Sequence, residues 1–273
     1  MSTAPIFIVG CPRSGTTMLY DHMARHPDLA WISNVSKKAA GSLAVIRLLG
    51  FFLRDGHPTE AKKVWGRFDI ADHHTLGRQD VTPAARRYFE KVVANHLRAA
   101  GKPRFLCKCP QNSLRIEFFD AIFPDAFFVH VVRDGRAVAN SILRARKKHG
   151  GGYWGCRPPE WRSILEHPML EASGLQWKTI VEHALRSGRA LPPERYVEVR
   201  YEDLCDRPEE TFLDVCSRVG LQWDPARVKG IMKDVKSRNY KWREAFTPAE
   251  IETLDSLLGD LLTKLGYELV PRK

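Results

Sequence analysis

A short run near the amino terminus carries groups that suit an anion. The residues are Arg13, Ser14, Gly15, Thr16 and Thr17. They follow the apolar run 6–9 and precede a helical pattern, so we expect a buried strand, a tight loop and a helix. Backbone amides of such a loop, together with hydroxyls at the start of the helix, donate to phosphate oxygens. The sequence therefore predicts a phosphate cradle.

The composition of this loop narrows its ligand. The spacing from Gly10 to Thr17 matches a P-loop, but Thr16 stands where that motif has lysine. Because that lysine serves the β- and γ-phosphates of a nucleoside triphosphate, ATP and GTP are disfavoured. Arg13 instead places a fixed positive charge inside the loop.

Two further cations follow other predicted strands. Lys108 ends the strand expected at 104–107, and Arg133 follows the central strand expected at 126–132. The helix that begins after Arg133 carries Ser141 on its second turn. Since ligands of open parallel sheets bind at the carboxyl ends of the strands, the first loop, Lys108 and Arg133 are expected to converge.

Candidate proton acceptors gather in the polar segment 54–80. They are Glu60, Asp72, His73 and His74, and His96 in the helix expected at 84–98 is a weaker candidate. Adjacent histidines do not predict a metal site, because neighbours on a chain cannot both face one ion as residues four apart on a helix do. The six cysteines contain no C-x-x-C pair, and no metal is predicted.

Predicted strands alternate with predicted helices along the chain, which indicates an α/β fold. We expect three layers, with a central, mainly parallel sheet flanked by helices. The apolar stretch 41–53 is too short to span a bilayer and is expected to be a buried helix; the alternatives are an apolar wall beside the site or a patch facing a membrane. The loop 149–160 contains glycines and aromatic residues, and it is either a lid or an ordinary surface loop.

The chain is basic, with 43 Lys and Arg against 32 Asp and Glu, and its net charge of +11 suits a polyanionic ligand, nucleic acid or an acidic membrane. It lacks long like-charge runs and zinc-finger spacing, so no nucleic-acid partner is predicted. Scattered cysteines and the absence of a secretory signal or a transmembrane segment predict a cytoplasmic protein. Peripheral membrane contact and a homodimer stay open.

Three motifs together resemble the sulfotransferases that use 3′-phosphoadenosine 5′-phosphosulfate (PAPS). They are the loop 12–17, the Val-Val-Arg-Asp-Gly-Arg-Ala run at 131–137 with Ser141, and the Val-Arg-Tyr-Glu-Asp-Leu run at 199–204. Their spacing is similar to the branch that includes tyrosylprotein sulfotransferases and many bacterial enzymes. The resemblance implies a P-loop-like sulfotransferase fold and a single domain over 1–273, with 36–80 and 149–190 as insertions on the acceptor side.

The resemblance also implies how the nucleotide binds. Residues 13–17 would hold the 5′-phosphosulfate, and Arg133 with Ser141 would hold the 3′-phosphate. Tyr201 would contact the nucleotide, and the basic segment 237–243, which includes Lys241 and Arg243, would close over it. A ligand with phosphates at both ends of a nucleoside needs two anion sites, and the sequence supplies two.

Sulfuryl transfer depends mainly on in-line positioning and charge stabilisation, and it needs no metal. Arg13 and Lys108, which lies where the family places a lysine, are expected to stabilise the oxygens of the transferred group. Related enzymes carry a glutamate several residues after a His-Pro pair, but Asn34 stands at roughly that place and cannot take a proton. The general base is therefore sought among the carboxylates and histidines named above, first of all Glu60, Asp72 and His73.

The predicted function is transfer of the sulfuryl group of PAPS, the co-substrate, to a hydroxyl, which leaves 3′-phosphoadenosine 5′-phosphate. The stretch 41–53 and several aromatic residues favour a partly apolar acceptor, such as a lipid or a small natural product, while a glycan or a tyrosine stays open. A P-loop nucleotide kinase or NTPase and a non-catalytic, phosphate-binding basic protein are the alternatives.

Overall fold

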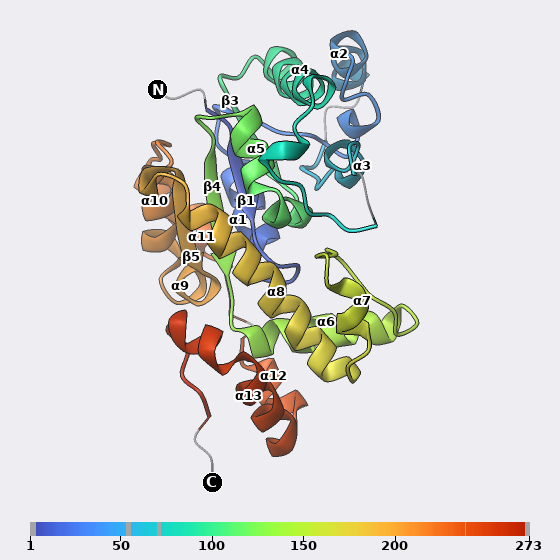
Figure 1. Ribbon diagram of the computed structural model, residues 1–273. Coiled ribbons are helices and arrows are strands. Elements are labelled where there is room, and N and C mark those ends of the chain that lie inside the picture. Colours follow the sequence, from blue (N-terminus) through green and yellow to red (C-terminus); the bar gives the residue numbers. More distant parts are fainter. Residues whose placement is uncertain (1–3, 53–55, 70–71, 238, 271–273) are drawn as a thin grey trace.

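The computed structural model describes residues 4–52, 56–69, 72–237 and 239–270 (Figure 1). Five parallel strands form one sheet in the order β2-β3-β1-β4-β5. The strands are β1 Ile6–Val9, β2 Leu29–Ala30, β3 Arg104–Lys108, β4 Phe127–Val132 and β5 Tyr196–Arg200. Helices cover both faces of this sheet, so the predicted three-layer α/β architecture is confirmed.

Parts of three predicted segments lie outside the described residues. They are position 53 of the stretch 41–53, positions 53–55 and 70–71 of the segment 36–80, and position 238 of the segment 237–243. The side chains of residues 49–52 are not described either.

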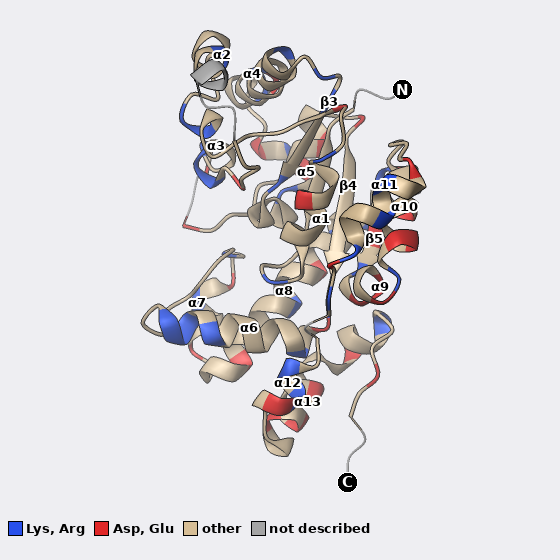
Figure 2. Ribbon diagram, turned by 180° about the vertical axis from the view of Figure 1, so that it is seen from behind, with Lys and Arg blue, Asp and Glu red and all other residues tan. Residues whose placement is uncertain are grey.

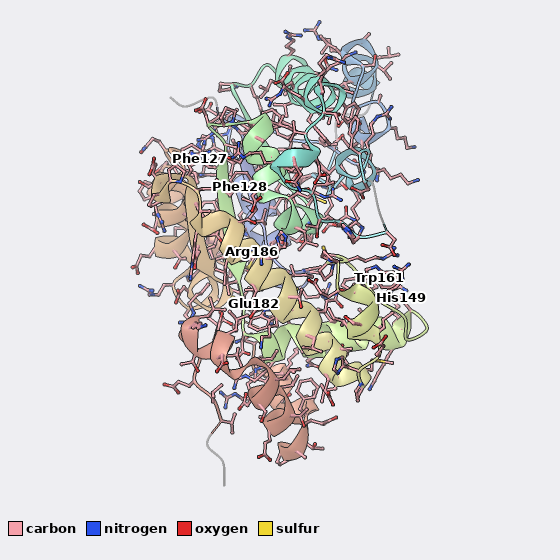
Figure 3. The ribbon with its side chains drawn as sticks, viewed as in Figure 1. Phe127, Phe128, His149, Trp161, Glu182 and Arg186 are labelled. Atoms are coloured by element: carbon pink, nitrogen blue, oxygen red, sulfur yellow. The ribbon has the colours of Figure 1, made fainter. Side chains whose placement is uncertain are left out.

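The central strand shows why helices lie on both faces. Every residue of β1 is buried, and successive side chains point to opposite sides of the sheet. Ile6 and Ile8 pack with α1 (Thr16–Met23), α10 (Pro208–Arg218) and α11 (Pro225–Met232), whereas Phe7 packs with α4 (Pro83–Ala100) and α5 (Ile116–Ile122). The neighbouring Phe127 and Phe128 of β4 divide in the same way, and Phe128 stacks on Phe7 with ring centroids 5.4 Å apart (Figure 3).

The helices of these two layers have the following bounds: α1 Thr16–Met23, α4 Pro83–Ala100, α5 Ile116–Ile122, α9 Tyr201–Asp206, α10 Pro208–Arg218 and α11 Pro225–Met232. Smaller elements between them are α2 Leu43–Phe52, α3 Lys62–Trp65, and 3-10 turns at Ser36–Lys38, Arg78–Asp80, Pro110–Leu114 and Pro193–Arg195.

A third apolar cluster lies beyond the carboxyl ends of the strands. It is built by α6 Gly135–Lys148, α8 Met169–Arg189, α12 Lys241–Ala245 and α13 Pro248–Lys264. The long helix α8 packs along α6 and α13 and buries Trp177. Within the predicted acceptor-side insertion 149–190, the helix α8 belongs to this cluster, and residues 149–168, which include α7 Trp161–Leu165, precede it.

Two details of the chain between 29 and 53 differ from prediction. The two-residue strand β2 was not predicted, because two residues are too few for an alternating pattern to show. The apolar stretch does form a helix, α2, but the prediction that it is buried was wrong: Ile46 is buried, whereas 40% of Val45 and 57% of Leu48 is exposed. The reason is that α2 packs mainly against α4 and a 3-10 turn, which cover one side of it. Within the described residues, no helix has the length and apolar character needed to cross a bilayer.

His130 makes the stability of the sheet depend on pH. It is fully buried on β4; its Nδ1 donates to the hydroxyl of Tyr196 at 2.6 Å, and that hydroxyl donates to the carbonyl oxygen of Ala184 at 3.3 Å. Nε2 has no partner among the described residues. A proton added there would be buried without an acceptor, and burial lowers the pKa of His130 to about 4.

The folded-state pKa of His130 is below its unfolded value, so this contribution to stability is complete above the unfolded pKa and lost as pH falls toward the folded one. We expect the free energy of unfolding to fall by about 3 kcal/mol from this residue alone between pH 7 and pH 4. Denaturant titrations across that range measure it. His130→Gln should flatten the slope, whereas His149→Gln at the exposed end of α6 should not; equal slopes in all three proteins would contradict the assignment.

Candidate active site

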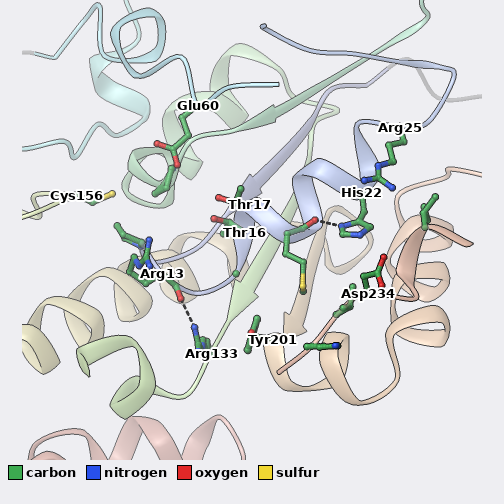
Figure 4. A pocket seen from close by; sticks show the side chains of 18 of the residues that line it. Arg13, Thr16, Thr17, His22, Arg25, Glu60, Arg133, Cys156, Tyr201 and Asp234 are labelled. Atoms are coloured by element: carbon green, nitrogen blue, oxygen red, sulfur yellow. Dashed lines mark hydrogen bonds between the residues drawn. The ribbon is translucent and has the colours of Figure 1, made fainter. Parts of the chain in front are cut away.

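A cavity of about 890 Å³ opens where the first loop meets α1 (Figure 4). Segments far apart in the sequence line it, including Arg13 and Thr17 of the loop, Glu60, Arg133 and Tyr201. The structure thus brings the first loop and Arg133 to one edge of the sheet, as the parallel arrangement of the strands requires.

The first loop has the backbone geometry of an anion cradle. Gly15 caps α1 with a φ of 94°, and a Cβ there would collide with the ring of Tyr201. Arg13 is also left-handed, with a φ of 77°. The amides of Gly15, Thr16 and Thr17 have no acceptor among the described residues, as is usual for a first helical turn, so they can donate to an anion. Ser14, within the loop, is fully buried.

Arg133 organises the side of the cavity next to this loop. Its Nη1 donates to the carbonyl oxygen of Arg13 at 3.0 Å, and its Nε donates to Oδ1 of Asn239 at 3.0 Å. Its guanidinium lies 4.2 Å from the ring centroid of Tyr201. Arg13 in turn donates from Nε to Oγ of Ser141 at 2.8 Å. The two predicted anion sites are therefore adjacent and hydrogen-bonded to each other, as the contact between Arg13 and Arg133 in Figure 4 shows.

The carboxylate of Glu202 supports Arg133 indirectly, through hydrogen bonds to residues around it. Oε1 accepts from the backbone N–H of Asp134 at 3.1 Å and from the amide of Asn239 at 2.9 Å, while Oε2 accepts from the hydroxyl of Tyr267 at 2.9 Å. Burial raises the pKa of Glu202, although these donors act in the opposite direction. Glu202 belongs to the motif 199–204 and Asn239 to the segment 237–243, whereas Tyr267 was not predicted to contribute; the contacts among the three are formed only by the fold.

Lys108 lies at the opposite side of the loop. It ends β3 and is 3% exposed, and its Nζ donates to Oγ1 of Thr17 at 2.9 Å and to Oε1 of Glu60 at 2.7 Å. Lys62 pairs with the other carboxylate oxygen of Glu60 at 3.0 Å. Burial raises the pKa of Glu60, but the two ammonium groups outweigh it and hold this pKa below its ordinary value. The predicted Lys108 and Glu60 are thus a single ion pair beside the first loop.

The backbone explains how Glu60 reaches Lys108. Residues 57–59 run antiparallel beside residues 32–34, with a β-bridge between Ser33 and Pro58. The amide of Asn34 donates to the carbonyl oxygen of His57 at 2.9 Å, and the amide of Thr59 donates to that of Ile32 at 3.0 Å. The segment that carries Glu60 therefore pairs with the segment that carries Asn34, and Glu60 directly follows Thr59, which lies opposite Ile32.

The other candidate proton acceptors lie away from the cavity lining. Asp72 is exposed and forms an ion pair with Arg162. Nδ1 of His73 accepts from the backbone N–H of Thr75 at 3.2 Å. Neither Asp72 nor His73 is among the described residues that line the cavity.

The two remaining histidines serve local structure. Nδ1 of His74 accepts from the backbone N–H of Arg157 at 2.8 Å, and burial together with nearby arginines lowers its pKa to about 4. His96 is buried, with its ring nitrogens 2.8 Å from the carbonyl oxygen of Val92 and 3.1 Å from Oγ of Ser36. Of all these candidates, Glu60 is the one placed at the cavity.

The basic residues that line the cavity near the carboxyl terminus are not the ones that the sequence predicted. Lys241 and Arg243 are exposed, the guanidinium of Arg243 lies over the ring of Trp242, and neither residue is part of the described cavity lining. Lys233 and Lys236 do line the cavity, and sequence reasoning missed them. Their signal was present in the sequence, because both lie within the four residues that precede the basic segment 237–243.

Three residues of the loop 149–160 line the cavity: Trp154, Gly155 and Cys156. The loop is anchored, since the carbonyl oxygen of Trp154 accepts from Nε2 of Gln176 at 2.7 Å. Among the described residues, no group of three or more His, Cys, Asp or Glu side chains is arranged to hold a metal ion.

The profile of the Sulfotransferase family matches residues 5–225. Nodulation protein NoeE of Sinorhizobium fredii is 27% identical over 96% of this chain, which spans only 65% of the length of NoeE. Omega-hydroxy-beta-dihydromenaquinone-9 sulfotransferase Stf3 of Mycobacterium tuberculosis is 24% identical over 97% of this chain and 75% of its own length.

Solved structures agree on the architecture. Sulfotransferase STF9 from Mycobacterium avium superposes with a TM-score of 0.65 at 16% identity, covering 100% of this chain and 79% of its own. At that identity the likeness establishes the P-loop-like sulfotransferase fold alone. Because the family profile covers most of the residues that build the sheet and the cavity, this chain belongs to the sulfotransferase family, whose members transfer a sulfuryl group.

Proposed function

We propose that the protein transfers the sulfuryl group of PAPS to a hydroxyl of a partly apolar acceptor. The observation that carries this proposal is the position of Lys108, whose nearly buried ammonium lies directly behind the cavity lining and donates to two residues that line it, Thr17 and Glu60. A cation at that point can stabilise oxygens of the transferred group, and the carboxylate beside it can take a proton.

In this proposal the acceptor hydroxyl attacks sulfur in line with the bond to the bridging oxygen. That bond breaks, 3′-phosphoadenosine 5′-phosphate leaves, and Glu60 receives the hydroxyl proton. The amides of residues 15–17 and the side chains of Arg13 and Lys108 would share the negative charge of the phosphosulfate. The sulfuryl oxygens of the bound phosphosulfate would draw the ammonium of Lys108 away from Glu60 and would add negative charge beside it. Both changes would raise the pKa of Glu60 toward that of a useful base.

The nucleotide would extend from the first loop toward Tyr201. Arg133 is already oriented there by Arg13 and Asn239, and Ser141 is connected to it through Arg13. Arg133 and Ser141 would receive the 3′-phosphate. Lys233 and Lys236 offer further positive charge on the same side, while Lys241 and Arg243 would have to move to reach it.

The acceptor would enter from the other side, past Trp154, Pro110 and Gln111. An aromatic side chain beside an amide suits a molecule with an apolar body and a polar end. One relative is named for a hydroxylated menaquinone and several others for protein tyrosine, so the names of the relatives do not decide between a lipid-like and a protein acceptor. Assays with hydroxylated quinones, fatty alcohols, oligosaccharides and tyrosine peptides would define the class.

The donor site is tested by calorimetric titration with 3′-phosphoadenosine 5′-phosphate in the absence of magnesium. We expect the wild-type protein to bind it, and Arg13→Ala and Arg133→Ala each to lose ~1.5–3 kcal/mol of binding free energy, the scale of a charged hydrogen bond. Arg189→Ala is the matched control, because Arg189 pairs with Glu198 outside this cavity.

Three further outcomes carry information about the same site. If the double replacement Lys233→Ala/Lys236→Ala weakens binding more than Lys241→Ala/Arg243→Ala, the cavity-lining pair holds the nucleotide; the reverse order would restore the role predicted for the segment 237–243. Binding of ATP in place of the bisphosphate would refute the PAPS proposal and favour a P-loop kinase.

A further inference from the structure

The helix α2 presents apolar side chains to solvent. Val45 and Leu48 are one turn apart on it, and they are two of the four large apolar side chains that are exposed among the described residues. Ala44 is exposed as well. A stable helix of a globular protein normally turns such residues inward. This face is therefore free to contact a partner.

A basic hollow of about 420 Å³ lies beside the amino-terminal end of this helix, and the residues just before the helix form part of its lining. Four cations line it: Lys37, Lys38, Lys63 and Arg67. The described lining contains no carboxylate, and no described salt bridge involves any of the four. The positive charge of the hollow is thus not neutralised by the surrounding described residues.

The apolar helix and the basic hollow form one surface. Residues 39–42 line the hollow and lead directly into α2, which packs against the 3-10 turn of Lys37 and Lys38. α2 also packs on α4, which supplies Tyr88 to the hollow. Figure 2 shows basic positions on α2, α3 and α4 at this end of the molecule.

The short helix α3 connects this surface to the candidate active site. Lys62 lines the main cavity and pairs with Glu60, whereas the next residue, Lys63, lines the basic hollow. A partner held by the hollow would therefore lie close to the side of the cavity from which we propose that the acceptor enters.

We propose that α2 and the basic hollow dock the protein on an anionic lipid membrane. Exposed apolar side chains enter the interface between headgroups and acyl chains, and a rim of lysines and arginines is attracted to anionic headgroups. An acidic protein would match the charge of the hollow, but it would not explain why α2 exposes apolar side chains beside that hollow. This docking does not depend on the reaction that we propose for the cavity.

Sedimentation with vesicles tests the docking in the absence of any nucleotide or acceptor. We expect the full chain to bind equimolar phosphatidylcholine and phosphatidylglycerol and to bind pure phosphatidylcholine much less. Lys37→Gln/Lys38→Gln should lower the partition coefficient ~25-fold, since each lysine near an anionic surface contributes about fivefold. Leu48→Ser should lower it ~10-fold by removing an inserted apolar side chain.

Matched variants elsewhere serve as controls. Lys147→Gln/Lys148→Gln removes two exposed lysines at the end of α6, and Leu269→Ser removes an apolar side chain that is 41% exposed. Neither should change vesicle binding. Absence of binding by the wild-type protein, or equal losses in control and test variants, would overturn the proposal.

Two additional readouts distinguish membrane docking from binding to an acidic protein and from a folding defect. A loss with the lysine variant but not with Leu48→Ser would indicate a purely electrostatic partner, such as an acidic protein, and would also overturn membrane docking. Binding of 3′-phosphoadenosine 5′-phosphate should be unchanged in all four variants, which checks their folding. If the wild-type protein binds vesicles but not this nucleotide, membrane docking stands and the donor proposal fails.

Discussion

Replacing Lys108 with alanine is expected to lower kcat for sulfuryl transfer by ~10²- to 10³-fold, the effect of removing one preorganised charge from a transition state. The ammonium is nearly buried and lies within hydrogen-bond distance of Thr17 and Glu60, so water cannot easily replace it. Affinity for 3′-phosphoadenosine 5′-phosphate should change much less, because that product lacks the transferred group. Steady-state kinetics and calorimetry together separate the two effects.

Lys62→Ala is the matched control for this prediction. Lys62 holds the other oxygen of the same carboxylate, yet 57% of its side chain is exposed and it has no contact with Thr17 among the described residues. We expect a loss of less than ~10-fold, in keeping with a solvent-exposed pair. If Lys62→Ala were as slow as Lys108→Ala, Lys108 would act by setting the charge of Glu60 and not on the sulfuryl group.

Replacing Glu60 with glutamine is expected to lower kcat by ~10²- to 10⁴-fold, the contribution of a positioned general base. The substitution keeps the shape of the side chain and removes its ability to take a proton. Because a general base matters less for a more acidic hydroxyl, the loss should shrink along a series of acceptors of decreasing pKa. A merely structural Glu60, which only positions Lys108, would give the same loss for every acceptor.

The pH profile gives a second check on Glu60. A base must be deprotonated, so activity is present above its pKa and lost as pH falls through it. Since the two lysines hold the pKa of Glu60 below its ordinary value, the acidic limb of kcat/KM should lie at lower pH than an ordinary glutamate would give. The acidic limb of kcat should lie at a higher pH than the acidic limb of kcat/KM, because in our proposal a bound donor raises the pKa of Glu60. An acidic limb of kcat/KM near neutrality would point to a histidine instead.

Local patterns in the sequence were sufficient for the fold and for the residues at strand ends. The run before Gly10 reads as a buried strand, and Lys108 and Arg133 each mark the carboxyl end of a neighbouring strand. Parallel pairing then fixes where those ends meet, with no need for long-range information. The positions of Lys108 and Arg133 at strand ends were for this reason predictable from strand assignment and from the parallel arrangement of the sheet.

The part of the site that loops supply was not predictable in the same way. Glu60, Asp72 and His73 had equal standing in the sequence, and it is the pairing of 57–59 with 32–34 that sets Glu60 apart. Such a pairing depends on the tertiary fold and leaves no periodic signal. The exposure of α2 is a similar case, because its apolar sequence carries no information about how many sides the fold covers.

The contacts of Glu202 have a consequence for the end of the chain. Tyr267 and Asn239 lie beyond residue 225, where the family profile stops, yet both donate to the carboxylate that supports Arg133. Cutting the chain after Leu265 would remove one donor from a largely buried negative charge and loosen the asparagine that orients this arginine. Proteolytic removal of the residues after Leu265 would thus weaken binding of the proposed nucleotide, although the described residues among them do not line the cavity. The segment after Leu265 stabilises the position of Arg133 through Glu202 and Asn239.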